Sequence, residues 1–370
     1  MKSTSAKQRK IKVGIWGLGR AGFSMHVNEL KALPNEFEIV AGCDIAQERL
    51  DNFAKSLPNA KLYLDGDAFL ADPNVELVAV AVRSQQHVDY AIRALEAGKY
   101  VFAEKPFALT SAGLKKFAAA DKKFPGRIFM RHNRRFEPAF NHISEIIKSG
   151  VLGEVFEIKL CRHQWSFRDD WQTLIECGGG QLNNWGPHII DHSLQLLGAP
   201  VESMWSDLKV VAAVGDAEDH LKIVFRGENG RIVDMEISGG IALPSPAYAV
   251  YGTRGSLICK DEKTIELKYL DKKFKLPPKM SARKATPDFG YAFCKAFPPK
   301  WVEESIPVAP KNKANCEQIY HNVYESIRKG KKYPITLAEA CEVVKWTEKV
   351  KKQNKSFGIA PDVFGCRGLM

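Results

Sequence analysis

Short apolar runs alternate with helical stretches of mixed polarity in the first third of the chain. Apolar runs predict strands at 11–16, 37–43, 76–82, 100–103 and 127–130, and mixed stretches predict helices at 46–57 and 85–97. The run at 76–82 has almost no polar position, which is typical of a strand covered on both faces. Strands that alternate with helices indicate a parallel, doubly wound α/β sheet.

The pattern changes after about residue 130, where Gly, Asp and Asn separate several strand-like runs. A helix at 138–148 precedes a long strand at 155–167, and further strands are predicted at 207–213, 220–226, 231–238, 246–251, 256–259 and 264–269. Helices follow at 315–328 and 338–350, and Thr336 and Glu339 form a capping box for the last one. Consecutive strands of this kind predict a mainly antiparallel sheet in a second domain of the α+β class.

Composition limits the partners and the compartment. The net charge is +11, but basic clusters such as 329–332 lie near predicted helix ends without interleaved aromatic residues, so no nucleic-acid partner is predicted. No apolar run reaches the roughly 20 residues that a membrane helix needs, so no membrane association is predicted. The eight cysteines form no C-x-x-C pair, which favours free thiols and a cytoplasmic location. A periplasmic form whose leader has been removed is the alternative.

A glycine-rich turn directly follows the first predicted strand. Gly17, Gly19 and Gly22 stand in the order G-x-G-x-x-G before a predicted helix. The first glycine allows a tight turn, the second lets the backbone approach a pyrophosphate, and the third lets helix and strand pack closely. Asp44 ends the second strand, where a carboxylate can accept both ribose hydroxyls of NAD and would repel the 2′-phosphate of NADP. The turn therefore predicts an NAD-binding Rossmann domain. Further predicted cofactor contacts are Leu18, Arg20, Ala21 and Ile45.

A lysine follows another strand of this domain, in the sequence Glu104-Lys105-Pro106. The carboxyl ends of the strands in a doubly wound sheet face the ligand crevice, which puts Lys105 near the nicotinamide. A single lysine at a strand end is by default a surface residue, so the other motifs must decide between the two interpretations.

The second chemical signal is the sequence GGGQLNNWGPHIIDH at 178–192. Its first three glycines allow a loop to approach a ligand closely. If the segment is helical, Asn184, His188 and His192 share one face at a spacing of four residues. His188 is then a candidate acid–base group, and a buried structural histidine is the alternative. No metal site is predicted on the two histidines, because no third ligand is evident.

With these motifs in view, the chain resembles the Gfo/Idh/MocA oxidoreductase family, which includes glucose–fructose oxidoreductase and inositol dehydrogenases. The resemblance covers about residues 11 to 350. It rests on the glycine turn at 17–22, AGKYVFAEKP at 97–106, NRRF at 133–136, the loop at 178–188 and YGTRGS at 251–256. It implies NAD as the cofactor and an open-faced C-terminal sheet that pairs subunits, so a homodimer or homotetramer is predicted.

The resemblance also implies roles for individual residues. Lys105 matches the family lysine that contacts the reacting oxygen and often the nicotinamide ribose, and the Lys105–Pro106 bond is a candidate for the cis geometry often found there. His188 matches the family histidine of the G-x-H motif. The predicted catalytic residues are Lys105, His188 and Asn184. The remaining predicted cofactor contacts are Val82, Arg83, His87, Glu104, Lys105 and Asn133.

Two positions depart from the family pattern. Asn184 stands where the family usually has Asp, and an amide can orient a hydroxyl but cannot take up a proton as a carboxylate can. Val82-Arg83-Ser84 stands where many members have Thr-Pro-Asn beside the nicotinamide ribose. The Val82 side chain cannot form a hydrogen bond, and Arg83 adds positive charge near the pyrophosphate or the substrate.

The long strand at 155–167 supplies candidate substrate contacts. Phe156, Ile158 and Leu160 are predicted to share a face with Arg162, so that an apolar face becomes polar where the strand enters the cleft. Mixed hydrogen-bonding groups and indole rings suit a sugar, and arginines would also suit a carboxylate or phosphate. For each single residue, a solvated strand end is the alternative. The predicted substrate contacts are Lys105, Arg135, Arg162, Gln164, Trp165, Trp171, Asn184 and His188, with Arg168 and Asp170 as further candidates.

These features together predict an enzyme that transfers a hydride between NAD and a hydroxyl of a sugar, polyol or sugar derivative. Two alternatives stay open: an enzyme that retains NAD and eliminates or hydrolyses a glycoside through transient oxidation, and a non-catalytic NAD-binding sensor. Asn184 keeps the sensor open, whereas Lys105 and His188 argue against it. Two domains are expected at this length. The predicted limits are a disordered leader at 1–10, an NAD-binding domain at 11–130, and a substrate-binding and oligomerisation domain at 131–370.

Overall fold

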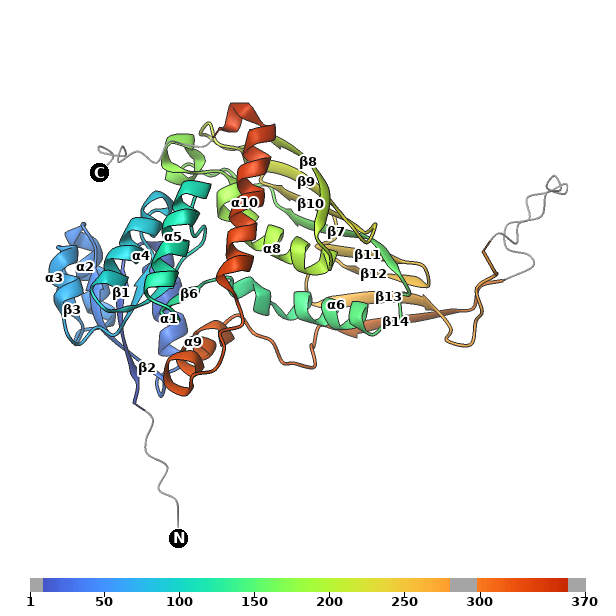
Figure 1. Cartoon of the computed structure of the whole chain (residues 1–370). Helices are drawn as coiled ribbons and strands as arrows, with labels where there is room; N and C mark the ends of the chain where they lie inside the picture. The colour runs from blue at the N-terminus through green and yellow to red at the C-terminus, as the bar shows by residue number, and fades with distance from the viewer. Residues whose placement is uncertain (1–8, 280–297, 359–370) are drawn as a thin grey trace, which may run out of the picture.

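Two β-sheets, each packed against helices, form the body of the protein (Figure 1). The computed structural model describes residues 9–279 and 298–358, so most of the predicted leader at 1–10 lies outside the described residues. The first sheet is parallel and the second is mainly antiparallel. Both predictions of sheet class are confirmed.

The first sheet has six strands within the described residues, in the order β3-β2-β1-β4-β5-β6. The strand order reverses between β1 and β4, and ligands of such sheets bind outside the carboxyl ends of the strands at this point. The strands are β1 (Ile11–Trp16), β2 (Phe37–Cys43), β3 (Lys61–Tyr63), β4 (Leu77–Val80), β5 (Tyr100–Ala103) and β6 (Ile128–Met130). The helices around it are α1 (Val27–Lys31), α2 (Gln47–Ser56), α3 (Gly66–Ala71), α4 (His87–Glu96) and α5 (Ser111–Lys123).

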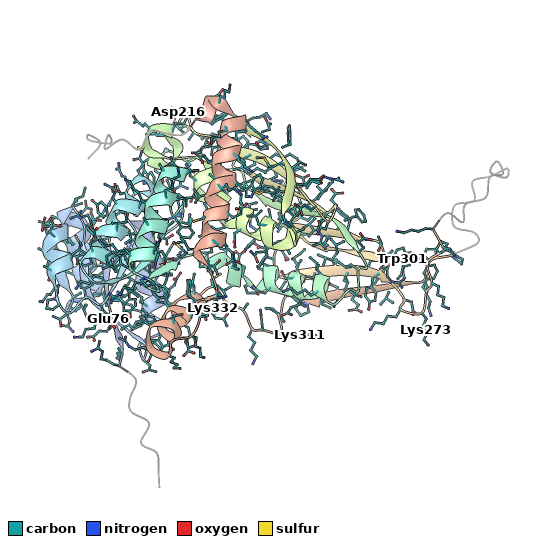
Figure 2. The ribbon with its side chains drawn as sticks, viewed as in Figure 1. Glu76, Asp216, Lys273, Trp301, Lys311 and Lys332 are labelled. Carbon is teal, nitrogen blue, oxygen red and sulfur yellow. The ribbon has the colours of Figure 1, made fainter. Side chains whose placement is uncertain are left out.

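The second sheet has eight strands within the described residues, in the order β14-β13-β12-β11-β7-β10-β9-β8. Its apolar side chains pack against α6 (Pro138–Lys148), α8 (Gly186–Leu197) and α10 (Leu337–Gln353). The far end of this sheet, marked by Lys273 and Trp301 in Figure 2, extends away from the first sheet. The strands are β7 (Val155–His163), β8 (Val201–Lys209), β9 (His220–Gly227), β10 (Ile232–Ser238), β11 (Tyr248–Gly252), β12 (Gly255–Cys259), β13 (Thr264–Leu270) and β14 (Trp301–Pro307).

Two of the differences between the second sheet and the prediction have a clear structural cause. Strand β8 covers 201–209 rather than 207–213, because the Asp219 carboxylate accepts hydrogen bonds from the backbone N–H groups of residues 211–213 and holds them in a loop. Phe156 does not share the inner face with Ile158 and Leu160. A register shift between β7 and β11 interrupts the alternation there, so Phe156 is 50% exposed.

The two C-terminal helices connect the sheets. Helix α9 (Gln318–Lys329) packs on the first sheet, where Tyr320 lies against Phe37 and Phe102. At its other end, Arg328 forms an ion pair with Glu76, which is labelled in Figure 2. Helix α10 begins at the predicted capping box and contributes side chains to both hydrophobic cores. The core of the first sheet therefore also contains residues from far beyond the range 11–130 predicted for that domain.

Candidate active site

The three glycines of the turn after β1 meet different steric conditions. Gly17 has a φ of +95°, and a Cβ atom on Gly22 would lie 1.8 Å from the Gly17 carbonyl oxygen. Gly19 is different, because the nearest atom to its ideal Cβ position is Arg49 Nη1 at 3.9 Å. The first and third glycines therefore hold the turn together, while Gly19 leaves its outer side open to a ligand.

Asp44 lies at the end of β2, against this turn. Its Oδ2 atom accepts a hydrogen bond of 2.7 Å from the Leu18 backbone N–H, and Oδ1 accepts one of 3.0 Å from Ala46. Arg49 forms an ion pair of 3.4 Å with the same carboxylate and is 55% exposed. The sequence interpretation overlooked Arg49, although its position five residues after Asp44 in α2 was a usable signal. Ile45 is exposed beside them.

Lys105 follows β5, and its bond to Pro106 is cis, as predicted. The Nζ atom donates hydrogen bonds to the Asn184 carbonyl oxygen at 2.8 Å and to Asn184 Oδ1 at 3.2 Å. Burial lowers the pKa of Lys105 to about 8; Glu104 opposes this decrease and Arg131 adds to it. A substantial fraction of this lysine is therefore uncharged at mildly alkaline pH.

Glu104 supports the backbone beneath Lys105. Its Oε2 accepts a hydrogen bond of 3.1 Å from the Lys105 N–H, and its Oε1 binds Arg131 at 2.9 Å and lies 3.2 Å from His26 Nε2. Burial raises the pKa of Glu104, but Arg131 and His26 outweigh it and hold the pKa well below its usual range. The Glu104 side chain is therefore occupied within the domain rather than presented to a ligand.

The segment that carries Asn184 and His188 folds as two short helices instead of one. Helix α7 (Gln181–Asn184) ends at the residue that binds Lys105, and α8 begins after Trp185. His188 is buried, and its Nδ1 atom has no hydrogen-bond partner among the described residues. Burial and the nearby charges of Lys105 and Arg134 hold the pKa of His188 well below its ordinary value. This imidazole is therefore neutral at physiological pH.

His192 has partners that mark it as structural. Its Nε2 lies 2.8 Å from the Arg134 carbonyl oxygen, and its ring stacks on Phe140 with centroids 4.0 Å apart. Within the described residues, no group of His, Cys, Asp or Glu has the arrangement of a metal site. His192 is therefore held by a hydrogen bond and ring stacking, whereas Nδ1 of His188 has no partner among the described residues.

A further histidine, His132, was overlooked in the sequence. It follows β6, lies with its ring centroid 6.4 Å from that of His188, and is buried. Both of its ring nitrogens, and Oδ1 of Asn133, have no hydrogen-bond partner among the described residues. Burial lowers the pKa of His132 to about 4. Its position after a strand of the parallel sheet could have indicated it.

The segment at 82–87 lies between predicted cofactor residues and predicted substrate residues. His87 is buried, with Nδ1 at 2.7 Å from the Pro106 carbonyl oxygen and Nε2 at 3.0 Å from that of Val82. Arg83 lies over the ring of Trp171, 5.9 Å from its centroid. Predicted cofactor and substrate residues thus meet across this loop.

A cavity of about 270 Å³ lies beside Asn184, with Arg20 of the glycine turn and Gln164 in its wall. A second cavity of about 210 Å³ shares Gln164, Gln181 and Trp185 with the first. The structure therefore brings together a cofactor-turn residue, the Lys105 partner and a predicted substrate residue. Arg168 also lines the first cavity, paired with Asp170.

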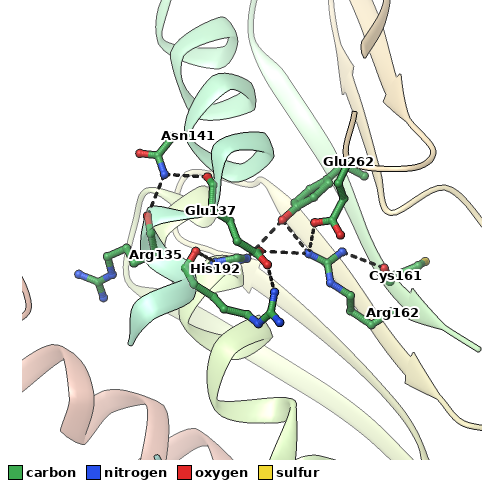
Figure 3. A network of polar contacts seen from close by, with 9 residues as sticks. Arg135, Glu137, Asn141, Cys161, Arg162, His192 and Glu262 are labelled. Atoms are coloured by element: carbon green, nitrogen blue, oxygen red, sulfur yellow. Dashed lines mark hydrogen bonds and ion pairs between the residues drawn. The ribbon is translucent and has the colours of Figure 1, made fainter. Parts of the chain in front are cut away.

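Three other predicted substrate residues do not line the first cavity. Arg162 borders the second cavity. Its Nη2 atom donates hydrogen bonds to the Tyr248 hydroxyl at 3.0 Å and to Glu262 Oε1 at 2.8 Å (Figure 3). Arg135 is bound to Asp191 and Glu339, and so joins its segment to α8 and α10. Strand β7 ends before Trp165, which is 56% exposed and forms an isolated bridge to Gly240.

Both parts of the sequence match models of one protein family. Residues 11–132 match the oxidoreductase family with an NAD-binding Rossmann fold, and residues 140–258 match the GFO/IDH/MocA C-terminal domain. The chain belongs to the Gfo/Idh/MocA oxidoreductase family. The resemblance inferred from the motifs is therefore confirmed.

Several relatives cover most of the chain. An uncharacterized oxidoreductase of Schizosaccharomyces pombe is 32% identical over 261 residues, which are 67% of this chain and 70% of the relative. The scyllo-inositol 2-dehydrogenase (NADP(+)) IolW of Bacillus subtilis is 26% identical over 352 residues, with 93% and 94% covered. The crystal structure of an NAD-binding protein from Listeria innocua has a TM-score of 0.78 at 26% identity, with 94% and 96% covered.

Two further findings concern this Gfo/Idh/MocA chain. The cysteines within the described residues form no disulfide, and Cys294 and Cys366 lie outside those residues. In the part of the chain that the structure describes, no helix is long and apolar enough to cross a bilayer.

Proposed function

We propose that this protein is an NAD-dependent oxidoreductase that transfers a hydride between the nicotinamide and a hydroxyl of a sugar, polyol or sugar derivative. The observation that carries the proposal is the position of Lys105. Its amine binds both Asn184 oxygens, follows a strand end of the Rossmann sheet, and has a pKa lowered to about 8. The inositol dehydrogenase name of the relative IolW supports a carbohydrate-like substrate.

In this proposal, Lys105 is the acid–base group that exchanges a proton with the substrate hydroxyl. Its uncharged amine accepts the proton as the alcohol is oxidised, and the ammonium returns it in the reverse direction. Asn184 holds Nζ through two acceptor oxygens, which fixes the amine in place. His188 stays neutral and hydrogen-bonds the hydroxyl, because its lowered pKa makes it a weak base. Bound NAD⁺ supplies the hydride acceptor, held by the glycine turn and Asp44.

A substrate screen tests the proposed function. The intact protein, incubated with NAD⁺ and a set of cyclitols and hexoses, should produce NADH with at least one of them. Failure of every compound, together with tight binding of NADH, would favour a non-catalytic sensor instead.

We expect a preference for NAD over NADP, because the Asp44 carboxylate meets the 2′-phosphate with like charge. Since like charges in contact cost several kcal/mol, NADH should bind at least about tenfold more tightly than NADPH. The substitution Asp44→Ser should reduce this ratio, whereas Arg49→Gln should increase it by removing the positive charge beside Asp44. Fluorescence titration with both reduced cofactors measures the ratio, and equal affinities in the unmodified protein would refute the assignment.

We also expect a homodimer or homotetramer, because helices cover one face of the eight-stranded sheet and the other face is available to a second copy. Trp205 of β8 is 55% exposed, and its neighbour in the sheet is Val224 of β9. Light scattering at micromolar concentration should give a multiple of the 41.3 kDa chain mass. The substitution Trp205→Glu should shift the distribution toward the monomer, and a monomeric unmodified protein would contradict the proposal.

A further inference from the structure

A buried carboxyl group lies in the wall of the cavity beside Asn184. Glu218 is only 3% exposed and lines this cavity together with Gln164 and Gln181. It belongs to the loop between β8 and β9, far in sequence from the motifs of the active site. Its position therefore brings a carboxyl group to the cavity from the second sheet.

Glu218 contacts the glycine loop that leads to the Lys105 partner. Its Oε1 accepts a hydrogen bond of 2.9 Å from the Leu182 N–H, and its backbone oxygen accepts one of 2.9 Å from Gln181. Gly180 has a φ of +95°, and a Cβ atom there would lie 2.1 Å from Oε1, so both the backbone conformation and this contact favour glycine. The contact with this loop fixes Glu218 relative to Asn184, the last residue of α7.

Among the described residues, no oppositely charged side chain contacts the Glu218 carboxylate. No ion pair within 4.0 Å involves Glu218 among the described residues, and the neighbouring Asp219 is occupied by the loop at 211–213. The balancing charge is Lys351 of α10, which is also buried. Burial raises the pKa of Glu218 to about 7, and Lys351 limits the increase. The group therefore changes charge near neutral pH.

We propose that Glu218 is a substrate-contacting residue whose carboxyl group hydrogen-bonds a hydroxyl of a neutral polyol in this cavity and disfavours anionic sugars. This inference rests on the proposed function. A carboxylate only accepts hydrogen bonds, which matches hydroxyl donors. Arg20 and Arg168 in the wall of the same cavity attract an anion, whereas the buried Glu218 carboxylate, which has no contact ion pair, repels it. Replacing Glu218 should therefore improve the binding of a sugar acid relative to the matching neutral sugar.

The main alternative is that Glu218 only supports α7, and Glu218→Gln separates the two roles. The glutamine side chain keeps an oxygen that can accept from Leu182 N–H, but it never ionises. A supporting role predicts unchanged kinetics at every pH. A substrate contact predicts a rise in KM that depends on pH, because hydrogen bonds to a charged group are the stronger ones.

The experiment measures kcat and KM with NAD⁺ and scyllo-inositol, myo-inositol, D-glucose or D-glucuronate, on both sides of pH 7. Above pH 7, Glu218→Gln should raise KM for the neutral substrate by roughly tenfold or more, with a smaller change in kcat. The difference should shrink below pH 7, where Glu218 of the unmodified protein becomes protonated. Use of D-glucuronate relative to D-glucose should increase in the variant.

A second variant changes Lys351, which does not line the cavity. Lys351→Met removes the balancing charge, and should move the pH dependence of KM to higher pH. The exposed Glu228→Gln, in the turn after β9, serves as the matched control and should leave the profile unchanged. If the unmodified protein oxidises none of these compounds and no compound of the wider substrate screen, the proposed function fails and this inference fails with it. If it is active and Glu218→Gln has the same KM at each pH, only this inference is overturned.

Discussion

Replacing Lys105 with alanine is expected to lower turnover by roughly 10²–10⁴-fold, the range typical of a well-placed acid–base group. The loss follows from removing the amine that accepts the hydroxyl proton and binds Asn184. Affinity for NADH should change little, because the glycine turn and Asp44, which would hold the phosphates and the ribose in the proposed site, are unchanged. Steady-state rates and fluorescence titration of NADH measure the two effects separately.

Lys105→Arg is the matched control for charge. A guanidinium keeps the positive charge but cannot lose its proton, so this variant should be about as inactive as the alanine variant. In the unmodified enzyme, the oxidation rate should rise with pH through about 8, as Lys105 loses its proton. Full activity of Lys105→Ala would refute the mechanism, and wild-type activity of Lys105→Arg would refute the role in proton transfer.

The second large effect is expected from Gly22→Ala, which should abolish measurable binding of NADH and lower the melting temperature. Its Cβ atom would lie 1.8 Å from the Gly17 carbonyl oxygen, so the turn must move. Overpacking of this kind typically costs about 1–3 kcal/mol of stability. Thermal melting and NADH titration of the variant measure both losses.

Gly19→Ala provides the contrast within the same motif. The nearest atom to that Cβ position is 3.9 Å away, so the variant should melt like the unmodified protein. It should still bind NADH more weakly, because in the proposed site the added methyl group would face the side on which the pyrophosphate would approach. If Gly22→Ala binds NADH normally, or if Gly19→Ala binds it as tightly as the unmodified protein, the cofactor site has been assigned incorrectly.

The elements that the sequence predicted best are the buried strands. The bounds of β1, β2 and β5 agree with the apolar runs, because these strands are mostly apolar and Lys12 and Glu38 are their only charged residues. Strand β14 was missed because its residues are mostly exposed at the edge of the sheet. Strand β8 was misplaced because its end depends on Asp219, a contact that local pattern cannot reveal.

The same distinction holds in the candidate site, where residues of local motifs could be predicted and residues joined by tertiary contacts could not. The glycine turn and Lys105 were predicted, since their chemistry follows from a strand, a turn and their order along the chain. The role of Glu218 and the partners of Arg162 could not be predicted from the sequence. These residues come from separate strands and loops, which meet only in the folded sheet. The break between α7 and α8 has a local signal instead, because Pro187 in the first turn of α8 has no backbone N–H to continue the preceding helix.

Isotope transfer tests the central claim most directly. A polyol that the protein oxidises is labelled with deuterium at the carbon of the reacting hydroxyl, and the NADH formed is isolated and analysed by mass spectrometry. Direct hydride transfer predicts that the deuterium is found on the nicotinamide ring of the NADH. Unlabelled NADH, with the deuterium in the solvent or retained in the sugar product, would contradict hydride transfer from the substrate hydroxyl carbon.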